Sequence, residues 1–147
     1  MLDEKDEKIL KTLIDDGRKS VVEISDELEI PRATVQERLK KMVETGVIRK
    51  FVAVPDYSKL GKGVVAYVFV SFRNEENVSQ RSLWEQASKL PGVYEVSAIS
   101  GEWDVLLKVR GGSVEEIATL VVERLRATKG IAKTETCIAF HVIKESF

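Results

Sequence analysis

The chain has 147 residues, of which 44% are hydrophobic and 32% are charged, a composition typical of one or two small globular domains. The longest apolar run covers residues 64–70, far short of the roughly 20 residues that span a bilayer, and the N-terminus has no signal-peptide pattern. A single cysteine, Cys137, and a single histidine, His141, exclude an internal disulfide framework and are too few for a zinc site. We therefore expect a cytoplasmic protein without metal or cofactor.

A net charge of −1 conceals an uneven distribution of charge along the chain. Residues 1–29 carry ten acidic and five basic side chains, whereas residues 30–62 carry eight basic and three acidic ones. Binding of nucleic acid depends on local potential, so a nearly neutral chain with one basic segment can still bind DNA.

Two helices are expected at the start of the chain. Asp3 can cap a helix whose apolar residues recur at helical spacing, and Gly17 suits its C-terminus. A second, short helix fits residues 21–29 and would bury Ile24 and Leu28.

A third helix and a wing should follow. Pro31 disfavours helical angles at Ile30 and can itself lie in a first helical turn, so the chain breaks there. The next helix is predicted over residues 32–45, with Gly46 ending it. Residues 47–54 alternate in polarity and are rich in β-branched side chains, which predicts a short hairpin or wing.

The second half of the chain alternates strands and helices in the order β-α-β-β-α-β, as in ferredoxin-like folds. Strands are predicted over residues 64–72, 93–100, 103–110 and 134–143. The first of these strands is apolar on both faces, so helices should cover one face and a partner subunit the other. The chain is thus predicted to be an α+β protein with a winged helix-turn-helix over residues 1–54, a linker over 55–63 and a βαββαβ domain over 64–147.

In a helix-turn-helix, the last helix lies in the major groove of DNA. On a helical wheel, Val35, Leu39 and Met42 share the buried side, and Gln36 on the opposite side is the best candidate base reader. The basic side chains around it suit phosphates. The candidate DNA-binding residues are Arg32, Thr34, Gln36, Glu37, Arg38, Lys40, Lys41, Arg49 and Lys50. The alternative is a helical bundle whose charges only solvate its surface.

Several motifs, in order along nearly the whole chain, resemble the Lrp/AsnC (leucine-responsive, feast/famine) transcription regulators. In the first half they are Leu2-Asp3-Glu4, Ile24-Ser25, Ile30-Pro31, Thr34-Val35, Arg38-Leu39-Lys40-Lys41-Met42 and Gly46-Val47-Ile48. In the second half they are Pro91-Gly92-Val93, Ser100-Gly101-Glu102-Trp103-Asp104, and Thr134 with Thr136.

The resemblance implies a transcriptional regulator that binds pseudo-palindromic operators in double-stranded DNA and senses an amino acid or related metabolite. It also implies a homodimer formed through the sheet, with octamers as a further assembly. The residues implied to bind the effector are Gly101, Glu102, Trp103, Asp104, Thr134 and Thr136. Such a set is chemically reasonable, because a carboxylate such as Asp104 can bind an ammonium group and hydroxyl groups can bind a carboxylate.

Other interpretations stay open at this point. Residues 101–104 also fit a plain tight turn in which Gly101 supplies a positive φ. The chain could be a sensing or assembly module without DNA binding, although the basic third helix argues against this. The chain could also be an enzyme, because some tetrapyrrole decarboxylases resemble this two-domain architecture. One histidine is too few for that chemistry, and no catalytic residue is predicted. Cys137 is expected to be a small buried strand residue.

Overall fold

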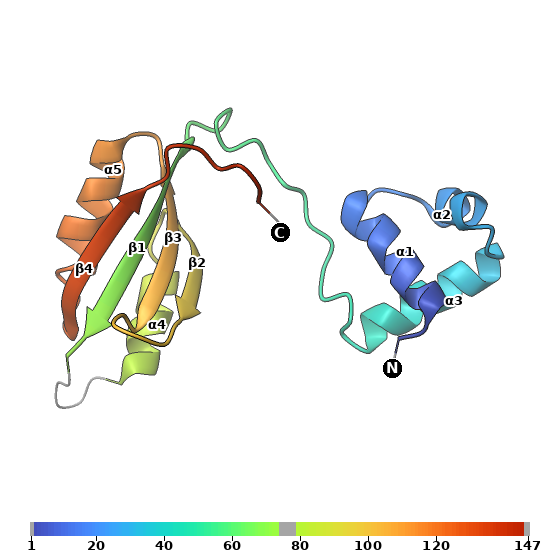
Figure 1. Ribbon diagram of the computed structural model, residues 1–147, viewed down its shortest axis with the longest axis horizontal. Helices are drawn as coiled ribbons and strands as arrows, with labels where there is room; N and C mark the ends of the chain where they lie inside the picture. Colours follow the sequence, from blue (N-terminus) through green and yellow to red (C-terminus); the bar gives the residue numbers. More distant parts are fainter. Residues whose placement is uncertain (1, 74–78, 146–147) are drawn as a thin grey trace. The chain divides into compact units, whose positions relative to one another are not determined.

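The computed structural model describes residues 2–73 and 79–145. The chain divides into two compact units, Met1–Val54 and Pro55–Phe147 (Figure 1). Each unit has its own hydrophobic core. Among the described residues, no helix combines the length and apolarity needed to cross a membrane.

The first unit consists of three helices, which confirms the helix prediction. They are α1 (Glu4–Asp15), α2 (Val21–Leu28) and α3 (Arg32–Glu44). Their buried core is formed by Ile9, Ile24, Ile30, Val35, Met42 and Ile48. Asp3 caps α1 as predicted, and Asp6 returns the bond by accepting from the Asp3 backbone N–H, which completes a capping box. A second capping box, not predicted, joins Ser20 and Glu23 at the start of α2.

The three helices end in different ways. Gly17 does not end α1 in a left-handed conformation, because the helix already stops at Asp15 and the backbone becomes extended at Asp16. At the end of α2, Glu29 adopts the left-handed conformation (φ 54°, ψ 38°), the one positive φ outside glycine among the described residues. Gly46 follows α3 with φ 74°, as its predicted role as a stop requires.

The predicted hairpin over residues 47–54 does not form. All of these residues are described, and none belongs to a strand. A hairpin needs a tight turn, and this segment contains no glycine, proline, asparagine or aspartate to make one. Phe51, Val52 and Val54 are exposed, so no apolar face is buried that would stabilise a two-stranded ribbon.

The second unit is the predicted βαββαβ fold. Its elements are β1 (Val64–Phe72), α4 (Gln80–Ser88), β2 (Val93–Ala98), β3 (Val105–Gly111), α5 (Val114–Thr119), a π-helical turn η1 (Leu120–Leu125) and β4 (Ile131–Ile138). The sheet has the strand order β2-β3-β1-β4, with every pair antiparallel.

The helices cover one face of this sheet (Figure 1). Alternate β1 residues Ala66, Val68 and Val70 pack into the core with α5 and η1, while Tyr67 and Phe69 lie on the opposite face and are only half-buried. Cys137 is exposed, contrary to expectation, because it pairs with Tyr67 on an edge strand rather than facing the helices. The sheet thus has one closed and one open face.

Several boundaries differ from the prediction. Strand β4 starts at Ile131 and ends at Ile138, so the predicted strand residues 139–143 leave the sheet, and residues 139–145 form a tail without regular structure. Residues 55–63, expected to be a linker, lie in the second unit and form a turn in which the Lys62 N–H donates to the Tyr57 carbonyl at 2.8 Å. The turn and the tail both bear on the sites described below.

Candidate functional site

The exposed side of α3 is the candidate DNA-binding surface. Val35 and Met42 bury one side of the helix in the core, and the opposite side carries four exposed polar residues, Gln36, Glu37, Lys40 and Lys41. In the first turn, Arg32 is exposed with Asp26 at 3.9 Å, and Thr34 is half-buried. Helical periodicity therefore gives α3 a polar face that is free of core contacts.

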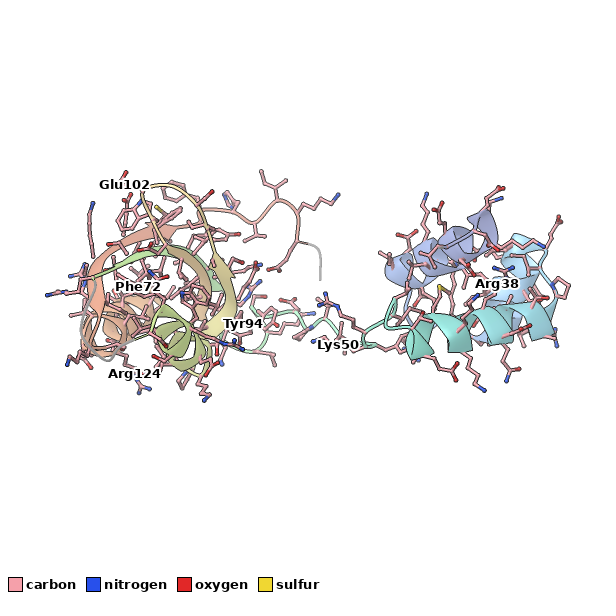
Figure 2. All side chains as sticks on the ribbon, turned by 90° about the horizontal axis from the view of Figure 1, so that it is seen from below. Arg38, Lys50, Phe72, Tyr94, Glu102 and Arg124 are labelled. Atoms are coloured by element: carbon pink, nitrogen blue, oxygen red, sulfur yellow. The ribbon has the colours of Figure 1, made fainter. Side chains whose placement is uncertain are left out.

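Arg38, another candidate DNA-binding residue, forms ion pairs within the first unit. Its Nη1 donates to Asp3 Oδ2 at 2.5 Å and to Asp6 Oδ1 at 2.7 Å, which fastens α3 to the N-terminal cap of α1 (Figure 2). Backbone N–H bonds and the Arg38 guanidinium together hold the pKa of Asp3 and of Asp6 below the usual aspartate value. Two carboxylates thus compensate a cation that the sequence suggested for DNA phosphates, and they join α3 to α1; a contact of Arg38 with DNA stays a prediction.

Three other cations remain well placed for phosphates. Lys41 lies in the last turn of α3, and Arg49 and Lys50 follow in the exposed segment after it (Figure 2 labels Lys50). The described residues offer none of the three an ion-pair partner, whereas Lys40 has Glu44 at 3.7 Å in an exposed pair of little strength.

The turn between β2 and β3 is the candidate effector site. Gly101 has φ 122°, which favours glycine, so the tight-turn interpretation holds for this residue. Asp104 is tied to the end of β1: its Oδ2 accepts from the Phe72 N–H at 2.8 Å, and its own N–H donates to the Val70 carbonyl at 3.0 Å. One carboxylate oxygen of Asp104 therefore holds the turn in place.

The other turn residues face the open side of the sheet. Trp103 lies against Phe69, with ring centres 6.0 Å apart, and Lys133 Nζ lies 4.6 Å from the centre of the Trp103 ring. Lys133 also pairs with Glu102 at 3.6 Å. These contacts join the turn to β1 and β4 on the open face of the sheet.

The two threonines lie on the other side. Thr134 pairs with Val70, whose side chain faces the helices, and its hydroxyl accepts from Arg126 Nε at 2.8 Å. Thr136 is exposed two residues further along the same strand. Because side chains alternate across a strand, the single chain does not gather Trp103 and the threonines into one pocket.

A cavity that was not predicted from the sequence lies at the other end of β3. It has a volume of about 480 Å³ and lies between the turn at Tyr57, the buried Arg110 and the tail that carries Glu145. A signal did exist in the sequence: Lys108 and Arg110 place two cations on one face of an otherwise apolar strand.

Comparison with known proteins agrees with this arrangement. Residues 2–49 match the model of a winged helix-turn-helix DNA-binding domain, and residues 65–147 match that of the Lrp/AsnC ligand binding domain. The uncharacterized HTH-type transcriptional regulator PF0250 of Pyrococcus furiosus is 41% identical over 145 residues, covering 99% of this chain and 97% of the relative. The HTH-type transcriptional regulator FL11 of Pyrococcus horikoshii is 32% identical over 145 residues, covering 99% and 93%.

Solved structures show the same fold. The transcriptional regulator NMB0573 of Neisseria meningitidis, solved as an L-Met complex, superposes with a TM-score of 0.93 at 25% identity, covering 99% of this chain and 94% of that one. AsnC of Escherichia coli superposes with a TM-score of 0.89 at 20% identity, covering 100% and 97%.

Fold and matches together define a transcriptional regulator with a winged helix-turn-helix domain and a separate ligand-binding domain. The chain belongs to the Lrp/AsnC family of HTH-type transcriptional regulators. Its relatives are regulators and not enzymes, so the decarboxylase alternative is set aside.

Proposed function

We propose that this regulator binds its operator sequence-specifically through the exposed side of α3, with Gln36 reading base edges. The observation that carries the proposal is that the core fixes Val35 and Met42 inward, which turns Gln36 outward together with Lys40 and Lys41. Glutamine can make two hydrogen bonds to adenine, whereas lysines contact phosphates without reading sequence. Arg32, Thr34 and Glu37 are the neighbouring candidates, and Arg49 and Lys50 add phosphate contacts.

The protein would act as a symmetric homodimer on a pseudo-palindromic site, with octamers as a further assembly. Support comes from the open sheet face, where Tyr67 and Phe69 are only half-buried. Two recognition helices related by a twofold axis fit half-sites about one helical turn of DNA apart. A cytoplasmic location is part of the same proposal.

The effector is proposed to be an amino acid bound at the turn of Gly101, Glu102, Trp103 and Asp104, with Thr134 and Thr136 contributing from β4. One related structure is an L-Met complex, and Asp104 keeps one carboxylate oxygen for an ammonium group. Since the chain alone does not unite these residues, the site would be completed in the assembled protein.

Fluorescence anisotropy with labelled DNA tests the proposal. The full chain is titrated into its own upstream DNA and into a scrambled duplex, at two salt concentrations, with and without amino acids. Wild type should prefer the upstream DNA, and Gln36→Ala should lose roughly tenfold of that preference. Lys89→Ala, an exposed lysine of the second unit, is the matched control and should change nothing. Equal binding of both duplexes by wild type would contradict sequence-specific recognition.

A further inference from the structure

The cavity at the end of β3 is built around a buried cation. Arg110 is 6% exposed, and its guanidinium carbon lies 4.1 Å from the ring centre of Tyr57 and 5.8 Å from that of Tyr94. The carboxylate of Glu145 neutralises it: Arg110 Nη2 lies 2.6 Å from both carboxylate oxygens, and Lys108 Nζ donates to the same group. A buried guanidinium without an anion would be strongly unfavourable, so this position requires a carboxylate or a similar group.

The segment that supplies this carboxylate is weakly attached. The Ala139 N–H donates to the Val65 carbonyl at 2.9 Å, and no further backbone hydrogen bond holds the described residues 140–145. Phe140 is 94% exposed and Ile143 is 98% exposed, so the tail buries little apolar surface. Among the described residues 140–145, Glu145 thus holds the tail through its ion pairs with Lys108 and Arg110.

The cavity is large enough for a small metabolite. Its volume of about 480 Å³ lies within the range of ligand sites in proteins. Apolar atoms of Pro55, Val65 and Val142 line it beside the Tyr57 ring, and the two cations lie at one end. A molecule that matches these walls has a carboxylate at one end and an apolar body.

We propose that Lys108, Arg110 and Tyr57 form a binding site for a small carboxylic acid with an apolar body, and that Glu145 is an internal ligand which such an acid displaces. This site differs from the turn over residues 101–104. Because that turn precedes β3 and Arg110 lies near the end of β3, the two lie at opposite ends of the strand.

Glu145 competes with a ligand only if it is charged. Burial raises the pKa of Glu145, but hydrogen bonds from Lys108 and Arg110 outweigh burial and leave the pKa below its usual value. The side chain is therefore ionised at neutral pH. Removing its charge while keeping its shape should remove the carboxylate that competes with a ligand for Lys108 and Arg110.

Calorimetric titration of the full-length protein tests the proposal. The probe is 4-methylpentanoate, and 4-methylpentanamide, which has the same body without charge, is the control ligand. Glu145→Gln should bind the acid at least about tenfold more tightly than wild type, since an internal competitor is removed. Lys108→Gln, combined with Glu145→Gln, should remove most of that gain. Glu85→Gln, which alters another ion-paired glutamate of the second unit, should bind like wild type.

Folding and assembly are measured on the same samples. Thermal unfolding should show that the acid stabilises Glu145→Gln more than wild type. Equal affinity in both proteins, no binding by Glu145→Gln at millimolar acid, or equal binding of the amide would overturn the proposal. So would a change of sedimentation coefficient in Glu145→Gln without a change in acid affinity, because the tail would then serve contact with a second copy. None of these readouts uses DNA, so failure of the proposed DNA recognition is distinguishable.

Discussion

Glu29 occupies a backbone conformation that suits glycine, in the turn between α2 and α3. Its φ of 54° and ψ of 38° lie in the left-handed region, which costs a residue with a Cβ atom about 1–2 kcal/mol. Glycine avoids this cost but loses about 0.5–1 kcal/mol more in backbone entropy on folding. Among the described residues the Glu29 side chain has no hydrogen-bond or ion-pair partner that the substitution would remove. Glu29→Gly should therefore stabilise the first unit by about 0.5–1 kcal/mol.

The assay is thermal unfolding of the full chain, with hydrogen exchange of α3 amides to report on the first unit. A unit of this size should gain a few degrees in Tm, since about 1 kcal/mol shifts a small domain by roughly 4–8 °C. Glu29→Ala is the matched control, because it removes the carboxylate but keeps the Cβ atom. If Glu29→Ala stabilises the unit as much as Glu29→Gly, relief of acidic repulsion and not backbone conformation is responsible, and the reasoning is refuted.

Three perturbations test the other contacts. Acid should destabilise the first unit, because folding lowers the pKa of Asp3 and Asp6. Their contribution to the free energy of unfolding is complete above about pH 5, begins to decrease near the ordinary value of 3.8 and is lost as the pH falls through the lower pKa of the folded state. Urea unfolding against pH should show this loss, and Arg38→Gln should flatten the dependence. Asp104→Ala should lower the free energy of unfolding in urea by about 1–2 kcal/mol, because it leaves the Phe72 N–H without its acceptor. Asp104→Asn should keep most of the stability but lose the response to amino acids. An unchanged stability in Asp104→Ala would show that this hydrogen bond is unimportant. Replacing Arg49 and Lys50 by alanine should reduce the slope of log K against log salt in anisotropy titrations by about 0.9 for each phosphate that the protein no longer neutralises, and an unchanged slope would remove both residues from the interface.

The local order of elements could be predicted because it depends on neighbours in the chain. Apolar spacing acts within a few residues, and it placed Ile9, Val35 and Met42 in one core. The helix cap at Asp3 and the turn formers that separate β1 from the first unit act over the same short range. The alternation in residues 64–72 likewise indicated a strand with two apolar faces. The hairpin over residues 47–54 was wrong for the converse reason, since alternation without a turn or a buried face does not make a ribbon.

Which charged groups are available was decided by tertiary structure alone. Arg38 looked like its basic neighbours in sequence, yet Asp3 and Asp6, more than 30 residues away, meet it because α1 and α3 pack together. In the same way Arg110 on β3 meets Glu145 of the tail, 35 residues later in the chain. Local sequence determines helix faces, caps and strands through short-range geometry. The partners of a charge depend on which distant segments the core brings together. The Coulombic attraction between an anion and a cation is much stronger at low exposure than in water.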